Sequence, residues 1–263
     1  FINDHGLRFI VRRVTRRGRL TFDSRARAGA TAVNPFLPFD PELFVADISA
    51  THVALLNKFN LTPHHLLIVT RRFVPQEVLP DDDDVAALCA CLAQVDGLGF
   101  YNAGAAAGAS QAHKHWQMIP LPLASEGPST PIDTALESVR DRTGVITIPG
   151  LAFRHSFTWL DPSLFRRPAD ATARIALVCP ELLERIGVTS IERGGARYQS
   201  APWNLLITRQ WMLAAPRVRE DFNRVPINAL GFAGSLYARD DAQFATIKRA
   251  GPMAALKAVT GDG

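Results

Sequence analysis

Long apolar runs and a cysteine framework are both missing from this sequence. No uninterrupted apolar stretch reaches about 18 residues, so a membrane-spanning helix is not expected. The three cysteines, Cys89, Cys91 and Cys179, are too few to form a disulfide framework, which indicates a reducing, cytoplasmic location. The arginine-rich start lacks the pattern of a secretory signal peptide. Because the chain begins with Phe1 rather than methionine, whether its N-terminus is trimmed stays open.

Positive charge is present in excess. The net charge is +4, and eight arginines fall between Arg8 and Arg27. This run has two interpretations: a solvated face of an N-terminal strand and loop, or a surface that attracts a polyanion. The run has little aromatic interleaving, and the sequence holds no nucleic-acid signature such as the RRM motif. A small polyphosphate is therefore a better candidate ligand than a nucleic acid.

The apolar pattern predicts an α+β fold. Strands follow one another and helices stand between groups of strands, which favours an antiparallel sheet over a doubly wound one. Four aspartates, Asp81 to Asp84, open the first expected helix, and one of them should be its N-cap. The expected strands are 8–14, 52–59, 65–70, 98–104, 152–160, 204–217 and 227–239, and the expected helices are 81–95, 131–142, 171–188 (broken by Pro180) and 240–259.

The stretch GASQAHKHWQMIPL, residues 108–121, places two histidines and a glutamine at alternate positions. Residues two apart in a strand share a face, so His113, His115 and Gln117 should point one way, and the residues between and after them the other, namely Lys114, Trp116 and Met118. Just upstream, NAGAAAGAS carries two glycines among alanines, which lets backbone N–H groups approach a ligand closely. The sequence therefore predicts a phosphate cradle that leads directly into a paired-histidine strand.

This combination suits attack by an imidazole on phosphorus. A histidine side chain is nucleophilic and mostly neutral near pH 7, because its ordinary pKa is about 6.5. Forming a phosphoramidate divides a displacement between two anions into two steps. The amides of the glycine segment, with Ser110, Gln111 and Lys114, are candidates to neutralise the negative charge.

Two other interpretations stay open at this point. Two histidines at this spacing can bind zinc, with His64, His65 or His155 as further ligands. The histidines can equally lie on a polar strand face without any function. Spacing alone does not separate these interpretations from catalysis.

HKHWQ resembles the histidine-x-histidine-x-glutamine variant of the histidine-triad motif. Five segments, NPFLPFDPE, LLNKFNLTPHHLLIVTR, NAGAAAGASQAHKHWQ, NLLITRQWM and NALGFAGSL, are similar in sequence and order to the ATP adenylyltransferases, also called diadenosine tetraphosphate phosphorylases. The resemblance extends from Asn34 to Pro252. It implies one histidine-triad-like catalytic domain over residues 1–263, an antiparallel sheet with flanking helices, in which residues 196–263 complete the sheet.

The resemblance also implies residue roles. His115 would be the nucleophile that takes the adenylyl group, Gln117 would hydrogen-bond the transferred phosphate, and His113 would orient its neighbours. His65 stands where members of the superfamily carry a histidine near the motif. The expected substrate contacts are Asn57, Lys58, Asn102, Gly108, Ala109, Ser110, Gln111, Asn228, Ala229, Leu230 and Arg239, the last in place of a lysine. An N-terminal basic phosphate contact is also implied, with Arg25 and Arg27 as candidates.

The implied reaction is the reversible phosphorolysis of diadenosine tetraphosphate to ATP and ADP through an adenylyl-histidine. No metal-ligand set is visible and no dedicated cofactor is expected, although a divalent cation such as Mg²⁺ can accompany the phosphates. The expected partners are nucleotides and phosphate, not a membrane or a nucleic acid. Two alternatives stay open: a related nucleotidyltransferase acting on a nucleotide sugar, and a non-catalytic nucleotide or nucleic-acid binder.

Overall fold

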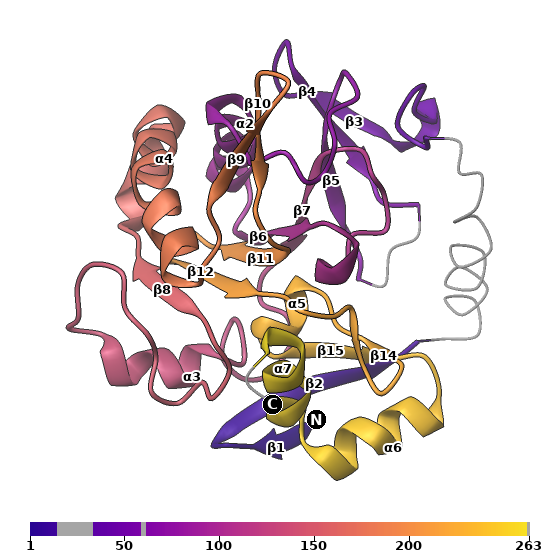
Figure 1. The fold of residues 1–263 in the computed structure, drawn as a ribbon, viewed down its shortest axis with the longest axis vertical. Helices are drawn as coiled ribbons and strands as arrows, with labels where there is room; N and C mark the ends of the chain where they lie inside the picture. Colours follow the sequence, from indigo (N-terminus) through magenta and orange to yellow (C-terminus); the bar gives the residue numbers. More distant parts are fainter. Residues whose placement is uncertain (15–33, 59–61, 262–263) are drawn as a thin grey trace.

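A large antiparallel sheet forms the centre of the molecule (Figure 1). The computed structural model describes residues 1–14, 34–58 and 62–261, and within these ranges the sheet has eight strands in the order β3-β4-β5-β7-β6-β11-β12-β8. This confirms the predicted α+β class with an antiparallel sheet. The strands are β3 (Phe44–Asp47), β4 (His52–Leu56), β5 (Leu66–Thr70), β6 (Gly97–Ala103), β7 (His115–Pro120), β8 (Ser156–Trp159), β11 (Trp203–Ile207) and β12 (Trp211–Pro216).

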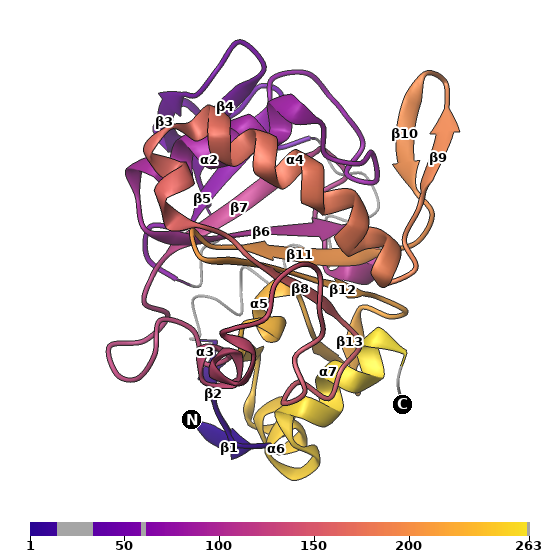
Figure 2. The same ribbon diagram turned by 90° about the vertical axis from the view of Figure 1, so that its left-hand side faces the viewer.

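The two faces of the sheet are covered differently (Figure 2). Helices α2 (Asp82–Gln94) and α4 (Pro168–Arg185) pack against each other and cover one face. The other face carries α5 (Ala229–Phe232) and a small sheet that joins the two ends of the chain. In that sheet, β15 (Ser235–Ala238) pairs in parallel with β2 (Leu7–Arg13), which pairs with β1 (Ile2–Asp4).

Alternation along the central strands places apolar clusters on both faces of the sheet. Phe100 and Ile119 belong to the cluster on the α5 side, whereas Tyr101, Trp116 and Met118 belong to the cluster beneath α2 and α4. Successive strand residues point to opposite faces, so the strands at the centre of the sheet, β6, β7, β11 and β12, contribute to both of these clusters. The side chains of His115 and Gln117 therefore lie on the face of β7 that is directed toward α5.

The predicted start of the first helix is confirmed. Asp81 is the N-cap of α2 and accepts a hydrogen bond from the Asp84 backbone N–H, while the Asp84 side chain accepts from the Asp81 N–H. This capping box satisfies two backbone donors that the first turn leaves unpaired. The remaining aspartates of the run, Asp82 and Asp83, are exposed in the first turn, where negative charge favours the helix dipole.

The expected break at Pro180 is wrong, because α4 continues through this residue. Apolar residues on both sides of it, among them Ile175 and Leu182, are buried against the core. Their burial holds the helix together although proline removes one intrahelical hydrogen bond. The expected helix over 131–142 is also reduced to two short pieces, α3 (Asp133–Leu136) and η3 (Glu137–Val139).

Two predictions for the C-terminal part need correction. The strand expected over 227–239 is interrupted by α5, because Asn228 caps that helix by accepting from Leu230 N–H at 3.1 Å. The helix expected over 240–259 is two helices, α6 (Asp241–Ala250) and α7 (Pro252–Thr260). Gly251 separates them with φ of 87°, a conformation that favours glycine.

The remaining elements are short. No helix within the described ranges is long and apolar enough to cross a membrane. The hairpin of β9 and β10 stands beside α4, and η2 lies in the glycine segment (Figures 1 and 2). These elements are η1 (Pro41–Leu43), η2 (Ala105–Ala107), η4 (Pro162–Arg166), β9 (Ser190–Arg193), β10 (Ala196–Gln199), β13 (Asp221–Phe222) and β14 (Val225–Pro226).

Candidate active site

The histidine–glutamine face predicted from spacing is present on β7. His115 begins the strand and Gln117 follows on the same side, whereas Trp116 packs on Tyr101 in the opposite core cluster, with ring centroids 4.8 Å apart. His113 precedes the strand, but the ring of Phe36 contacts both histidine rings, at 5.5 and 5.4 Å. The two histidines and the glutamine therefore belong to one site.

His115 is held in one tautomer by its own strand. Its Nδ1 lies 2.8 Å from the carbonyl oxygen of His113, which can only accept a hydrogen bond. Nδ1 therefore carries the proton, and Nε2 is the basic nitrogen. The backbone N–H of His115 donates to Gln76 Oε1 at 2.8 Å, and Gln76 Nε2 donates to the carbonyl of Asn102 at 2.9 Å. These bonds fix the position of the imidazole from both sides.

His113 is a buried neutral side chain. Its Nε2 lies 2.9 Å from the carbonyl oxygen of Thr70, to which it donates, and Nδ1 lies 2.9 Å from Nδ2 of Asn34. Burial lowers the pKa of His113 below its usual value. Its carbonyl, rather than its ring, contacts His115. This geometry fits a residue that orients the neighbouring imidazole.

A chain of three polar side chains leads to Gln117. Asn57 Nδ2 lies 3.3 Å from Nδ1 of His65, and His65 Nε2 lies 3.0 Å from Oε1 of Gln117. An amide NH₂ only donates, so His65 accepts at Nδ1 and donates from Nε2 to the glutamine oxygen. The Gln117 oxygen is thereby engaged, and the NH₂ end of this half-buried side chain is directed away from His65. The site thus gains a fixed donor beside His115.

The glycine segment forms a tight turn. Gly104 and Gly108 have φ of 91° and 89° around the 3₁₀ turn η2. A Cβ on Gly108 would lie 3.1 Å from both Asn228 Cβ and the carbonyl oxygen of Ile227, so only glycine fits against the start of α5. The N–H groups of Gly108 and Ala109 donate within the turn, to Ala105 and Gly104.

The donors that remain for a phosphate differ from those expected. Gly108 and Ala109 use their N–H groups inside the turn, whereas the next two backbone N–H groups, of Ser110 and Gln111, have no acceptor among the described residues. Ser110 is exposed and Gln111 is half-buried. Of the four residues expected to form the cradle, Ser110 and Gln111 thus keep backbone N–H groups that are available to a ligand.

A buried network behind the turn contains residues that the sequence did not single out. Asn204 Nδ2 donates to Asn102 Oδ1 at 2.8 Å and to the Ala107 carbonyl at 2.9 Å. Arg217 Nη1 donates to Asn204 Oδ1 at 2.7 Å, and burial lowers the pKa of Arg217 to about 10. The Ala229 N–H donates to Asn102 Oδ1 at 3.0 Å, which ties α5 to β6. Both of these side-chain hydrogen bonds of Asn102 use its oxygen, so its NH₂ group is the end that can donate to a ligand.

These network residues carried no local signal. Asn204 and Arg217 lie about a hundred residues beyond the glycine turn in the chain, and each sits in an ordinary strand or strand end. They reach the turn only because β11 pairs with β6 in register, Asn204 opposite Asn102. A sequence motif reveals only residues that are close in the chain. The contacts of Asn204 and Arg217 with the glycine turn arise from strand pairing, so the motif did not reveal them.

The expected cations have carboxylates beside them in the described part of the chain. Lys114 is 1% exposed and its Nζ lies 2.5 Å from Asp84 Oδ2, so it belongs to the α2 side of the sheet and the expectation that it neutralises phosphate is wrong. Lys58 is exposed and pairs with Asp40 at 3.3 Å. Arg239 lies at the end of β15 beside Asp240, with N and O atoms 3.9 Å apart.

The arginine run at the N-terminus is described only in part. Arg8 pairs with Glu126 at 3.5 Å, and Arg13 pairs with Asp241 at 2.8 Å. Arg25 and Arg27, the candidates for a phosphate contact, lie outside the described residues. The three described ranges contain no cluster of three or more histidine, cysteine or acidic residues that could hold a metal ion.

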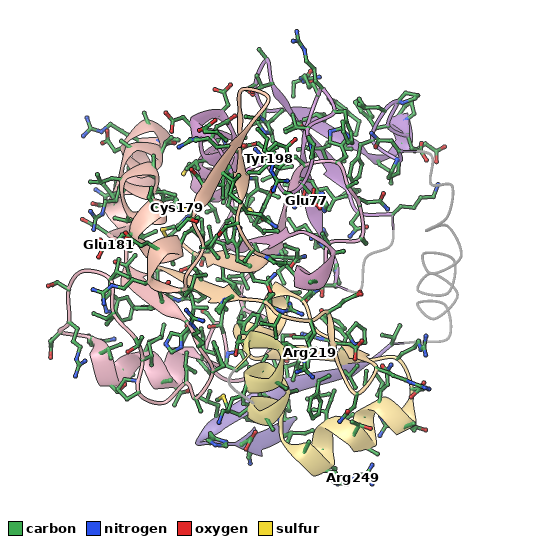
Figure 3. All side chains as sticks on the ribbon, in the orientation of Figure 1. Glu77, Cys179, Glu181, Tyr198, Arg219 and Arg249 are labelled. Carbon is green, nitrogen blue, oxygen red and sulfur yellow. The ribbon has the colours of Figure 1, made fainter. Side chains whose placement is uncertain are left out.

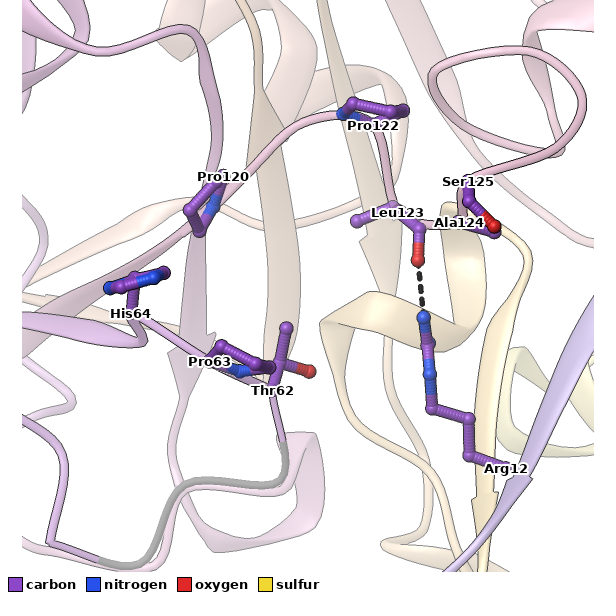
Figure 4. A pocket seen from close by; sticks show the side chains of 9 residues that line it. All are labelled: Arg12, Thr62, Pro63, His64, Pro120, Pro122, Leu123, Ala124 and Ser125. Atoms are coloured by element: carbon purple, nitrogen blue, oxygen red, sulfur yellow. Dashed lines mark hydrogen bonds between the residues drawn. The ribbon is translucent and has the colours of Figure 1, made fainter.

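A cavity of about 410 Å³ opens beyond the end of β7, on the segment that follows Gln117 (Figure 4). Arg12 reaches across from β2, donating to Ser235 Oγ at 2.8 Å and to the carbonyl of Leu123. Three prolines form part of its wall. Its lining residues are Arg12, Thr62, Pro63, His64, Pro120, Pro122, Leu123, Ala124 and Ser125.

Comparison with known proteins places the chain in a family. Residues 1–138 match the family described as the Ap4A phosphorylase N-terminal domain, and residues 149–261 match the ATP adenylyltransferase C-terminal domain. Diadenosine 5',5'''-P1,P4-tetraphosphate phosphorylase 2 of Saccharomyces cerevisiae is 25% identical over 252 residues, covering 83% of this chain and 72% of the relative. Protein APA1 of the same yeast is 24% identical over 233 residues, covering 79% and 67%.

Solved structures share the fold. The crystal structure of yeast Ap4A phosphorylase Apa2 matches with a TM-score of 0.70 at 22% identity, covering 87% of this chain and 79% of that one. The structure of Apa2 in complex with Ap4A matches with the same TM-score at 20% identity, covering 89% and 82%. With family matches over almost its whole length, the chain belongs to the Ap4A phosphorylase and ATP adenylyltransferase family of nucleotidyltransferases.

Proposed function

We propose that this protein phosphorolyses diadenosine tetraphosphate to ATP and ADP, reversibly, with His115 as the nucleophile. Membership of the family supports the reaction. The observation that supports the residue is the 2.8 Å contact between His115 Nδ1 and the His113 carbonyl. This contact makes Nε2 the nitrogen with the lone pair, and it stabilises the positive charge that the ring gains on attack.

In the first step Nε2 of His115 attacks one α-phosphorus of the substrate. A nitrogen–phosphorus bond forms, the bond from that phosphorus to the bridging oxygen breaks, and ATP leaves with the electron pair. An adenylyl-histidine remains. In the second step inorganic phosphate attacks the same phosphorus, the nitrogen–phosphorus bond breaks, and ADP leaves. Atoms and charge balance over the two steps, and ping-pong kinetics are expected.

The surrounding side chains supply donors for the negative charge. We propose that the Gln117 amide, aligned by His65, donates to a non-bridging oxygen of the transferred phosphate. The N–H groups of Ser110 and Gln111 and the NH₂ of Asn102 are proposed to bind neighbouring phosphates. The α5 start at Asn228, Ala229 and Leu230 is held against Asn102 and shapes the same wall.

Three further proposals concern the whole chain. We propose that the two family segments act as one catalytic domain, since β11 of the second segment pairs with β6 of the first. Divalent cations are proposed to act only when bound to the substrate phosphates. A cytoplasmic location is proposed from the three cysteines, which are all free thiols.

The test is a trapping experiment. Incubation with diadenosine tetraphosphate labelled in its α-phosphate, without inorganic phosphate, should give an acid-labile, base-stable adduct that mass spectrometry places on His115. His115→Ala should abolish the adduct and turnover, whereas His113→Ala should weaken turnover less. If the protein turns over a nucleotide sugar but does not phosphorolyse diadenosine tetraphosphate, the proposed substrate is wrong and the nucleotide sugar takes its place. An adduct that persists in His115→Ala, or that maps to another residue, would replace the proposed nucleophile.

A further inference from the structure

A buried arginine stands behind the glycine turn. Arg217 directly follows β12 and is 2% exposed. Its backbone N–H donates to the Pro202 carbonyl at 2.9 Å, which fixes the base of the side chain. Its Nη1 donates to the Ala107 carbonyl of the turn at 3.2 Å, and its Cζ lies 5.8 Å from the ring centroid of Phe232 in α5. The guanidinium therefore contacts both the turn and the helix that packs against it.

Neutral oxygens accept all the hydrogen bonds of this guanidinium. Nη1 donates to Asn204 Oδ1 at 2.7 Å as well as to the Ala107 carbonyl. Nη2 donates to the carbonyls of Arg219 at 2.8 Å and Glu220 at 3.0 Å. Nε is buried and has no hydrogen-bond partner among the described residues. Within residues 1–14, 34–58 and 62–261, Arg217 thus has no carboxylate bound to it.

This side chain keeps its charge near neutral pH. Burial lowers the pKa of Arg217 to about 10, and the carboxylate of Glu220, which is exposed, acts in the opposite direction. The guanidinium therefore stays protonated at pH 7. A buried charge is screened much less by solvent and salt than an exposed one. A buried cation without a bound counter-charge is costly for the protein, and a bound anion relieves that cost.

Arg217 differs in this respect from the cations that the sequence favoured. Lys58, Lys114 and Arg239 each have a carboxylate beside them. A neighbouring negative charge cancels much of the attraction that such a cation exerts on a phosphate. The charge of Arg217 is not reduced in this way.

Two side-chain amides connect Arg217 to the proposed phosphate donors. Arg217 Nη1 donates to Asn204 Oδ1, and Asn204 Nδ2 donates to Asn102 Oδ1 at 2.8 Å. The NH₂ group of Asn102 is the free end of this chain. Each hydrogen bond in such a chain polarises the next one, so the guanidinium makes the Asn102 NH₂ a stronger donor.

The same guanidinium controls a carbonyl of the turn. The Ala107 carbonyl accepts from Arg217 and, at 2.9 Å, from Asn204 Nδ2. Both donors are buried, so this carbonyl oxygen is held toward the interior of the protein. A carbonyl oxygen turned toward a phosphate would repel it, because both carry negative charge. Holding this oxygen inside therefore favours an anion on the outer side of the turn.

We propose that Arg217 is a positioning residue for the polyphosphate chain of the substrate. Its charge acts from behind the turn, through the amides of Asn204 and Asn102, and it does not touch the substrate. This role rests on the proposed function, because it concerns the phosphates that bind at the same turn. Attraction by a fixed charge grows with the charge of the ligand, so Arg217 favours nucleotides with a long phosphate chain over a monophosphate.

The affinities for ATP and AMP test this role. The two nucleotides share the adenosine and the α-phosphate, and they differ in the two further phosphates. Calorimetry near neutral pH, without divalent cations, gives both dissociation constants. Arg217→Gln removes the charge but keeps an amide donor, and it should weaken ATP binding about tenfold more than AMP binding. Arg217→Lys keeps the charge, and it should keep the ratio of the two affinities within about threefold of the natural protein.

Arg219→Gln is the matched control. Arg219 lies two residues further on, beside α7, and its side chain is exposed (Figure 3). The substitution removes the same formal charge from a position that solvent screens, so the ratio of the ATP and AMP affinities should not change. Thermal unfolding midpoints show whether each variant is folded.

A purely structural role would give a different result. If Arg217→Gln weakens ATP and AMP binding equally, or if Arg217→Lys loses the ATP preference as completely as Arg217→Gln, the role of the charge is overturned. If Arg217→Gln does not fold, the lysine variant decides by the same ratio. Either result in a natural protein that phosphorolyses diadenosine tetraphosphate overturns this role alone. A natural protein that binds neither nucleotide overturns the proposed function as well.

Discussion

Lys114 and Asp84 form a buried ion pair directly behind the strand that carries His115. Nζ lies 2.5 Å from Oδ2, and the side chains are 1% and 2% exposed. His52 Nε2 contacts the other carboxylate oxygen at 3.0 Å, and Lys114 also donates to the Leu79 carbonyl at 3.0 Å. The pair joins the start of α2 to the residue between the two histidines, so the histidine strand is anchored from the face opposite to its chemistry.

Removing one charge of this pair should destabilise the protein strongly. Asp84→Asn leaves the Lys114 ammonium buried without a counter-charge, and we expect a loss of about 3–5 kcal/mol in the free energy of unfolding. Urea denaturation followed by circular dichroism measures it. Asp83→Asn, an exposed position in the same helical turn, is the matched control and should change stability by less than about 1 kcal/mol. Equal effects of the two substitutions would contradict a buried, paired charge.

His113 should make stability depend on pH. Burial lowers the pKa of this imidazole in the folded protein, whereas the unfolded chain has the ordinary value of about 6.5. The unfolded state therefore binds protons first, and stability that is present above about pH 6.5 is lost as pH falls through the lower folded pKa. The free energy of unfolding should fall by at most about 1.4 kcal/mol for each pH unit in this interval.

The measurement is the free energy of unfolding at several pH values between 7.5 and 5, for the natural protein and for His113→Gln. The natural protein should lose more stability than the variant across this interval, because the variant lacks the titrating ring. Parallel curves for the two proteins would show that His113 does not contribute.

His65 should act on turnover through Gln117. Replacing His65 by Leu removes the donor that holds Gln117 Oε1, so the amide is no longer fixed beside His115. We expect kcat to fall by about tenfold, equivalent to about 1.4 kcal/mol, with a smaller change in KM. In a Gln117→Ala background the same substitution should cost almost nothing, because its partner is absent. Additive effects in this double-mutant cycle would contradict the linkage.

Gly108 should not tolerate a side chain. In Gly108→Ala the new Cβ combines a φ of 89° with contacts of 3.1 Å to Asn228 and to the Ile227 carbonyl. We expect a loss of about 2 kcal/mol in stability and reduced turnover, since the cradle and α5 must separate. Gly127→Ala is the control, because Gly127 has a φ of 94° with nothing within 4 Å of the new Cβ. Both variants place alanine at a positive φ, so the additional loss of stability in Gly108→Ala measures the effect of the contacts with Asn228 and Ile227. Equal losses in the two variants would show that these contacts have no effect.

The sequence predicted the features that depend on near neighbours. The alternation of His115, Trp116 and Gln117 over two faces follows from the period of a strand, and the cap at Asp81 follows from its place before a helical run. Most of the expected strands were found for the same reason, although the strand expected over 204–217 is the two strands β11 and β12. Pro180 was misjudged because the burial of residues on both sides of it, a tertiary effect, outweighs the local preference of proline.

The tertiary structure alone decided which groups meet across the sheet. Thr70 and Asn34 reach His113 from 43 and 79 residues away, and Arg217 reaches the glycine turn from 110 residues away. Strand periodicity already places Lys114 on the face opposite the histidines, but only the folded structure brings Asp84 to it there as the counter-charge that its burial requires. Residue types and spacing by themselves determined the chemistry of the motif and the face on which it lies. Contacts between distant segments determined the tautomer of His113 and the supports of His115 and Gln117, because hydrogen bonds of this kind form only when the whole sheet assembles.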